Sequence, residues 1–264
     1  MVMKILPLLF YRKKSISIFK VTEEDKRKEN SYRLTLTIIS KKIILKKKFM
    51  KNNLSLLLLM IFSFTLFSQQ KQSNKMKNVI VIGASGSLAK YVIDTLQNVP
   101  NVHLTLLVRD KTRIINDTTG KTIVKADVMD YPKLSTAIKG QDIVYINLAG
   151  DLEKMTNNIV KAMKENGVKR VIAISSIGIY KTPISSVLKP YRALADIIEV
   201  SGLDYTIIRP EWFTNGNEID YHITHKPEPE IGGAVSRKSI AAFVATVVQN
   251  PENYSNDNVG ISKL

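Results

Sequence analysis

The segment Gly83-x-x-Gly86-x-x-Ala89 has the residue types and the spacing of a loop that holds phosphate groups. Gly83 permits a tight turn, Gly86 lets the backbone approach a pyrophosphate, and the small Ala89 lets strand and helix pack closely. The start of the following helix would present free N–H groups to the phosphates, and serine hydroxyls would add donors. A purely structural turn is the alternative. We expect cofactor contacts from Gly83, Ser85, Gly86, Ser87 and Leu88.

Alternating strands and helices set the place of this loop in the fold. Residues 78–83, NVIVIG, are a short apolar run ending in glycine, as in a buried parallel strand. Residues 87–98 carry apolar side chains at helical spacing. The same alternation continues to residue 251 and predicts an α/β fold with a doubly wound parallel sheet, the Rossmann arrangement. Further strands are expected at 102–110, 122–127, 142–150, 169–176 and 203–210, and further helices at 131–140, 152–167, 191–202 and 236–251.

The end of the second strand indicates which dinucleotide the loop would hold. There Arg109 precedes Asp110, and two more cations follow within three residues. In this fold an acidic residue at that end binds the ribose 2′-hydroxyl of NAD, whereas an arginine accepts the 2′-phosphate of NADP. Because a planar guanidinium pairs well with a doubly charged phosphate, we expect NADP as the cofactor, with NAD as the alternative. Arg109 as a solvated surface charge is the competing interpretation.

A family pattern is carried by the segments VIGASGSLAKYV, LLVRD, KADVMD, DIVYINLAG, KRVIAISSIGIY, SGLDYTIIRP and VSRKSIAAFVATVV. Together they resemble the atypical short-chain dehydrogenase/reductase group, the single-domain NAD(P)H-binding proteins related to NmrA-like regulators and flavin or biliverdin reductases. The likeness runs from about residue 77 to residue 264 and implies a seven-stranded Rossmann sheet with a small C-terminal substrate region. It also implies adenine contacts from Asp127 and Val128, backbone contacts to the cofactor from Leu148, Ala149 and Gly150, and a nicotinamide end closed by Ser175 and Ser176.

The sequence departs from the wider superfamily in one catalytic feature. Catalytic members carry a Tyr-x-x-x-Lys pair, whose tyrosine passes a proton to the substrate carbonyl. Residues 76–264 contain no such pair, because Ala195 stands four residues after Tyr191 and Ile184 stands four after Tyr180. Tyr191 is therefore a candidate proton donor or ribose contact, with packing on a helix face as the alternative. The candidate catalytic residues are Ser175, Ser176 and Tyr191.

These features favour an NADP-dependent oxidoreductase that acts on a small carbonyl, quinone or flavin-like substrate. The missing pair favours a second hypothesis, a non-enzymatic redox sensor that binds NADP and a protein partner, as NmrA-like proteins do. Epimerase or dehydratase chemistry on a nucleotide sugar is a third hypothesis, and the short C-terminal region argues against it.

The segment 211–233 is expected to cover the sheet edge, either as a lid over the substrate or as a strand pair. Its aromatic residues Trp212, Phe213 and Tyr221 would line an apolar pocket or pack in the core. Tyr180 would either form a wall of the pocket or hold a loop.

Charge is divided unevenly along the 264 residues, whose formal net charge is +16. Residues 1–77 hold 18 of the 39 Lys and Arg but only 4 of the 23 Asp and Glu, which leaves 21 basic and 19 acidic residues in 78–264. The nearly neutral second part argues against a basic surface for nucleic acid, so we expect no nucleic-acid partner. With no Cys and three His, the chain is expected to hold no metal.

Residues 1–75 form a leader that lacks the family pattern and contains no glycine. Residues 1–49 are a basic extension without a consistent period and are expected to lie outside the fold, whereas 76–264 form the NAD(P)-binding domain. In 50–75, Lys51 precedes a 14-residue apolar run, as in a secretory signal peptide; a helix packed on the domain is the alternative.

The start of translation decides where the domain works. A start at Met76 would give a cytoplasmic domain, and a start at Met50 or Met1 would give an exported or membrane-anchored one, with membrane contact only through the leader. N-terminal sequencing of the native protein distinguishes these starts.

Overall fold

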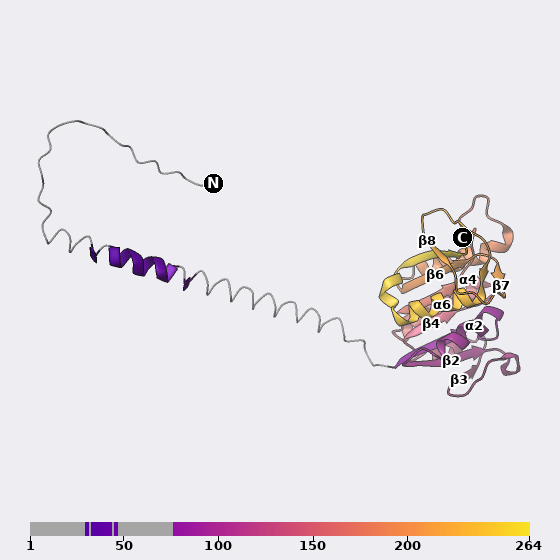
Figure 1. Cartoon of the computed structure of the whole chain (residues 1–264). Coiled ribbons are helices and arrows are strands. Elements are labelled where there is room, and N and C mark those ends of the chain that lie inside the picture. Colours follow the sequence, from indigo (N-terminus) through magenta and orange to yellow (C-terminus); the bar gives the residue numbers. More distant parts are fainter. Residues whose placement is uncertain (1–29, 32, 44, 47–75) are drawn as a thin grey trace, which may run out of the picture. The chain divides into compact units, whose positions relative to one another are not determined.

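The structure, a computed structural model, describes residues 30, 31, 33–43, 45, 46 and 76–264 (Figure 1). The described residues between 30 and 46 are helical, although the sequence there shows no consistent period. The segment predicted to be a signal peptide, 50–75, lies outside the described residues. In the described part of the chain, no helix is both long enough and apolar enough to cross a membrane.

Residues 76–264 form an eight-stranded sheet in the order β3-β2-β1-β4-β5-β6-β10-β8 (Figure 1). All neighbouring strands are parallel except β8, which runs antiparallel to β10 at the edge. This confirms the predicted Rossmann fold and adds β8 to the seven strands that the family resemblance implied. The strands are β1 Lys77–Ile82, β2 Val102–Val108, β3 Thr122–Lys125, β4 Ile143–Ile146, β5 Arg170–Ile174, β6 Asp204–Pro210, β8 His222–His225 and β10 Asp257–Ser262.

Helices cover both faces of the sheet, as a doubly wound fold requires. One apolar core contains residues of α2 and α6, and the other contains residues of α3, α4 and α5. Two short strands, β7 and β9, pair separately from the main sheet. The remaining elements are α2 Ser87–Leu96, α3 Tyr131–Ile138, α4 Leu152–Glu165, α5 Lys189–Glu199, α6 Arg237–Gln249, the 3₁₀ turns η1 Lys111–Arg113, η2 Ser186–Leu188 and η3 Pro251–Tyr254, and the strands β7 Phe213–Thr214 and β9 Val235–Ser236.

The continuous apolar run of β1 follows from its central place between two helix layers. Val79 and Val81 belong to the core that contains α2 and α6, whereas Ile80 and Ile82 belong to the opposite core. All four side chains are fully buried. Because successive side chains of a strand point to opposite faces, a strand covered on both faces needs apolar residues at every position.

A buried polar cluster lies beside β6 and β10 on the face covered by α5. The Arg209 side chain is only 2% exposed and forms an ion pair with Glu230. Its Nε donates to Asn258 Oδ1 at 2.8 Å. The second carboxylate oxygen of Glu230 accepts from the backbone N–H of Gly178 at 2.9 Å. Glu230 therefore connects β6 to the loop that follows β5.

Removing the Glu230 carboxylate is expected to destabilise the fold. In Glu230→Ala the guanidinium of Arg209 stays buried without its partner, which costs about 3 kcal/mol of unfolding free energy. Urea unfolding followed by circular dichroism measures this change. Glu252→Ala, which removes an exposed carboxylate, is the control; an equal effect of the two substitutions would contradict the buried ion pair.

Candidate functional site

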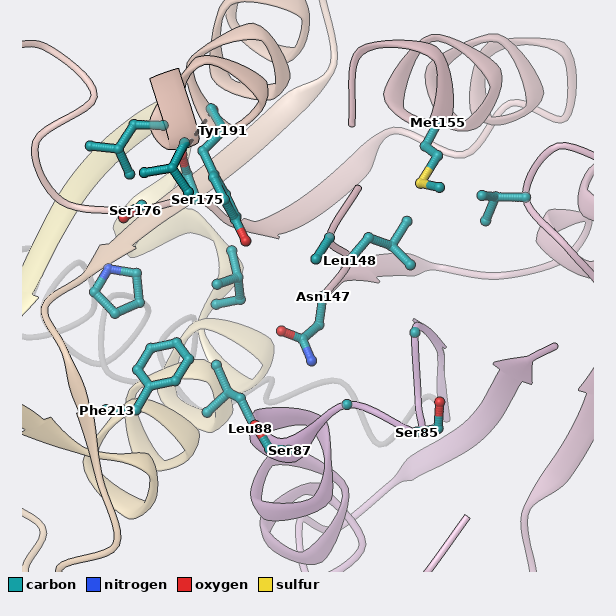
Figure 2. A pocket seen from close by; sticks show the side chains of 18 of the residues that line it. Ser85, Ser87, Leu88, Asn147, Leu148, Met155, Ser175, Ser176, Tyr191 and Phe213 are labelled. Atoms are coloured by element: carbon teal, nitrogen blue, oxygen red, sulfur yellow. Dashed lines mark hydrogen bonds between the residues drawn. The ribbon is translucent and has the colours of Figure 1, made fainter. Parts of the chain in front are cut away.

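A cavity of about 870 Å³ lies at the C-terminal ends of the parallel strands (Figure 2). The segments that follow β1 to β6 all contribute to it, at the edge where doubly wound folds bind ligands. The structure brings together thirteen of the fourteen predicted site residues around this one space. The exception is Gly150, which does not line the cavity. The residues brought together are Gly83, Ser85, Gly86, Ser87, Leu88, Arg109, Asp127, Val128, Leu148, Ala149, Ser175, Ser176 and Tyr191.

The phosphate loop has the backbone shape that its glycines predict. Gly83 has a φ of +86°, in the left-handed region. A Cβ on Gly83 would lie 2.2 Å from the carbonyl oxygen of Asn147, so the loop packs directly against the end of β4. Gly86 is the N-cap of α2, and no side chain of the described residues caps this helix start. The first N–H groups of α2 are thus available for an anion.

Asn147 is a site residue that the sequence pattern did not single out. It follows β4 directly and lines the cavity, and its side chain extends into it (Figure 2). A Cβ built on Gly86 would lie 2.7 Å from Asn147 Nδ2. The one feature of the sequence that could have indicated Asn147 is that a polar residue follows a buried apolar strand. Its direction could not be read from the sequence, because the side chain's orientation depends on how β4 pairs with β1.

The end of β2 presents arginine rather than aspartate to the cavity. Arg109 and Arg113 line it, whereas Asp110 does not. Asp110 Oδ1 accepts from the hydroxyl of Thr112 at 2.8 Å and from its backbone N–H at 3.0 Å. These two hydrogen bonds hold the pKa of Asp110 below its usual value. The Arg109 side chain is 71% exposed, with one guanidinium nitrogen 4.0 Å from the Asp127 carboxylate.

The predicted catalytic residues lie together at the ends of β5 and α5. Ser175 is buried, and its hydroxyl donates to the backbone carbonyl of Tyr191 at 3.0 Å. This bond connects the end of β5 to the first turn of α5. The Ser176 hydroxyl donates to the carbonyl of Ile177 at 3.2 Å.

The Tyr191 hydroxyl points into the cavity (Figure 2). Among the described residues it has no hydrogen-bond partner. A tyrosine hydroxyl in this position can donate to a bound molecule. Its role as a proton donor stays a prediction.

Apolar and aromatic side chains line the half of the cavity next to Tyr191. Val187, Leu188, Trp212 and Phe213 contribute from loops and short elements. The Trp212 side chain is 83% exposed. The sequence left two interpretations of these aromatic residues, pocket lining or core packing. Trp212 and Phe213 line the pocket. Tyr221 instead packs edge-on against Phe243 in the core.

Tyr180 lies outside the cavity, in the polar cluster next to Arg209. Its hydroxyl accepts from Asn258 Nδ2 at 2.8 Å, and Arg209 lies over its ring. Burial is the main reason why the pKa of Tyr180 is raised. Tyr180 thus holds a loop, which was one of the two roles expected for it. Within the described residues, no group of three His, Cys, Asp or Glu is arranged to hold a metal ion.

The sequence pattern of the NAD(P)H-binding family matches residues 83–251, which is more than half of the chain. The chain belongs to this NAD(P)H-binding family. A Rossmann-fold NAD(P)-binding family protein from Shigella flexneri is 42% identical, with a TM-score of 0.67 over 71% of this chain and 94% of that one. These findings confirm the NAD(P)H-binding Rossmann domain that the resemblance to the atypical short-chain dehydrogenase/reductase group implied.

Two further relatives of this NAD(P)H-binding protein are more distant. A short-chain dehydrogenase/reductase from Veillonella parvula, solved in complex with NADP, is 23% identical with a TM-score of 0.65, covering 71% of this chain and 94% of that one. An isoflavone reductase homologue from Nicotiana tabacum is 26% identical over 155 residues, or 52% of this chain. The chain spans about half of that relative's length, 49%.

The residues of the cavity fit an NAD(P)H dinucleotide. Gly86 has no side chain to block the backbone at the uncapped start of α2, where a pyrophosphate would bind. The segments after β2 and β3 would hold the adenosine, and those after β4 and β5 would hold the nicotinamide. The contacts of individual residues with the cofactor remain predictions.

Proposed function

We propose that the chain is an NADP-dependent reductase that acts on a small conjugated carbonyl, quinone or flavin-like acceptor. The observation that carries this proposal is one continuous cavity with two different ends. One end has the phosphate loop and two arginines, and the other has apolar walls around the Tyr191 hydroxyl. A dinucleotide whose phosphates bind at the first end would place its nicotinamide at the apolar end.

The choice of NADP over NAD rests on the end of β2. Arg109 and Arg113 line the cavity there, and the carboxylate of Asp110 is engaged by Thr112. An NAD-type contact needs a carboxylate free to accept from the ribose 2′-hydroxyl, whereas guanidinium groups suit a 2′-phosphate. The Veillonella parvula relative binds NADP, which agrees with this choice.

In this proposal, the residues of the apolar end donate a proton, position the proton donor and exclude water. Reduced nicotinamide, when bound, supplies the hydride. Tyr191 donates its hydroxyl proton to the acceptor oxygen that gains negative charge, and solvent at the open mouth returns that proton. Ser175 holds the first turn of α5 through the Tyr191 carbonyl and so positions the tyrosine. The apolar side chains of Phe213 and Leu188 exclude water from the acceptor.

The test is a screen of the full chain for oxidation of NADPH, followed at 340 nm, with quinones, flavins and aldehydes as acceptors. Turnover with any of these classes supports the proposal. Tight binding of NADPH without turnover would promote the redox sensor, and failure to bind NADPH would contradict both. The sensor remains the second candidate because Ala195, not lysine, stands four residues after Tyr191 and is buried.

Arg109→Ala is expected to weaken NADPH binding by about 1.5–3 kcal/mol, the range for a hydrogen bond to a charged group. NADH binding should stay nearly unchanged, because NADH lacks the 2′-phosphate. Isothermal titration with each cofactor measures both effects. Lys111→Ala is the matched control, since Lys111 neighbours Arg109 and does not line the cavity. Equal losses for NADPH and NADH would refute the assignment of Arg109.

A further inference from the structure

One charged side chain in the apolar end of the cavity has no role in the chemistry proposed above. Of the residues that the structure describes, three cations line the cavity, namely Arg109, Arg113 and Lys181. Among the described residues, the Lys181 ammonium has neither an ion pair nor a hydrogen bond. Its charge is therefore available to a bound molecule.

The place of Lys181 in the sheet separates it from the phosphates of a dinucleotide. It lies in the loop after β5, and the strand order β2-β1-β4-β5 puts that loop three strands away from β2. With neighbouring strands about 4.8 Å apart, the end of β5, where this loop begins, is roughly 14 Å from the strand end that carries Arg109. It is two strands, roughly 10 Å, from the phosphate loop after β1. Lys181 thus belongs to the acceptor end.

The backbone around Lys181 is held in place by the buried polar cluster. The Lys181 N–H donates to the carbonyl of Gly178 at 3.1 Å, and the Gly178 N–H donates to Glu230 at 2.9 Å. Glu230 is paired with the buried Arg209. A Cβ built on Gly178 would lie 3.3 Å from Leu188 Cδ1 and 3.8 Å from Lys181 Cδ. The Lys181 stem and the apolar wall residue Leu188 therefore both lie close to Gly178 on this anchored turn.

We propose that Lys181 selects acceptors that carry an acidic group, such as a carboxylate or sulfonate, on an apolar conjugated body. This inference rests on the proposed function of the cavity. The apolar walls take the body, and the ammonium pairs with the anion at the rim. Glu211, the only carboxylate at this end among the described lining residues, has one oxygen accepting from the Trp212 N–H at 3.0 Å. Its negative charge at the end of β6 disfavours placing the anion on that side.

The experiment measures binding, so it does not depend on turnover. Naphthalene-2-sulfonate and the neutral naphthalene-2-sulfonamide are titrated by calorimetry into the full chain saturated with NADP⁺. We expect the sulfonate to bind roughly three- to fivefold more tightly, as one ion pair with an exposed lysine provides. Lys181→Gln should remove this preference and leave the sulfonamide affinity unchanged, whereas Lys181→Arg should keep it.

The matched control is Lys189→Gln, which removes an exposed lysine of α5 that does not line the cavity. It should leave the preference for the sulfonate intact. The inference is overturned if the wild type binds both naphthalenes equally or binds neither, or if Lys181→Gln weakens both. It is also overturned if Lys181→Gln weakens NADP⁺ instead of the sulfonate. Failure of the wild type to bind NADP⁺ would contradict the proposed function, and titration of the cofactor-free chain would still test Lys181.

Discussion

Gly86→Val is expected to lower the affinity for NADPH by at least about 100-fold, the equivalent of losing one or two charge-assisted hydrogen bonds. The physical reason is that a side chain at the start of α2 would occupy the space that the pyrophosphate needs. The structure adds a second contact, because a Cβ at this position would also lie 2.7 Å from Asn147 Nδ2 and 3.2 Å from the Gly83 carbonyl oxygen. The clash is therefore not with the ligand alone.

A pair of variants separates these two contacts. Gly86→Ala introduces only the Cβ, and Gly86→Ala with Asn147→Ala removes the amide that the Cβ would meet. If the pyrophosphate is the main obstacle, the double variant binds NADPH more weakly than Asn147→Ala alone does. Gly233→Ala is the control, because a Cβ there meets no atom within 4 Å. A folded Gly86→Val chain with wild-type affinity for NADPH would contradict the assignment of the phosphate loop.

Tyr191→Phe is expected to lower turnover by roughly 100-fold or more, the usual contribution of a positioned acid. NADPH affinity should change little, because the ring is kept and only the hydroxyl that points into the cavity is lost. Steady-state rates with an active acceptor and calorimetry with NADPH measure the two quantities separately.

Tyr221→Phe is the control for Tyr191→Phe. Tyr221 packs against Phe243 and does not line the cavity, so its variant should retain wild-type turnover. Equal rates for wild type and Tyr191→Phe would make Tyr191 a packing residue. The proton would then come from Ser175, Ser176 or solvent.

Features encoded by neighbouring residues could be predicted from the sequence. The loop from Gly83 to Ala89 is set by glycine spacing between an apolar run and a helical pattern, and both flanking elements occur where expected. β10 was not predicted, because DNVGIS contains a glycine and polar residues that a local apolar pattern does not reveal. Its burial comes from pairing with β6 on one side and β8 on the other.

Residues that reach the cavity from loops depended on tertiary structure. Lys181 lines the cavity because the fold brings the loop after β5 to it. No period or spacing in the sequence carries that information. Tyr180 is the opposite case. It follows a predicted strand, which is where cavity residues occur, but its contacts with the buried Arg209 and Asn258 keep it in the neighbouring polar cluster.

A crystal structure of the chain with NADP⁺ tests the central claim most directly. The account predicts the pyrophosphate at the start of α2 beside Gly86, the 2′-phosphate within hydrogen-bond distance of Arg109, and the nicotinamide between Ser176 and Tyr191. A dinucleotide bound elsewhere, or bound with its nicotinamide at the end of β2, would contradict it.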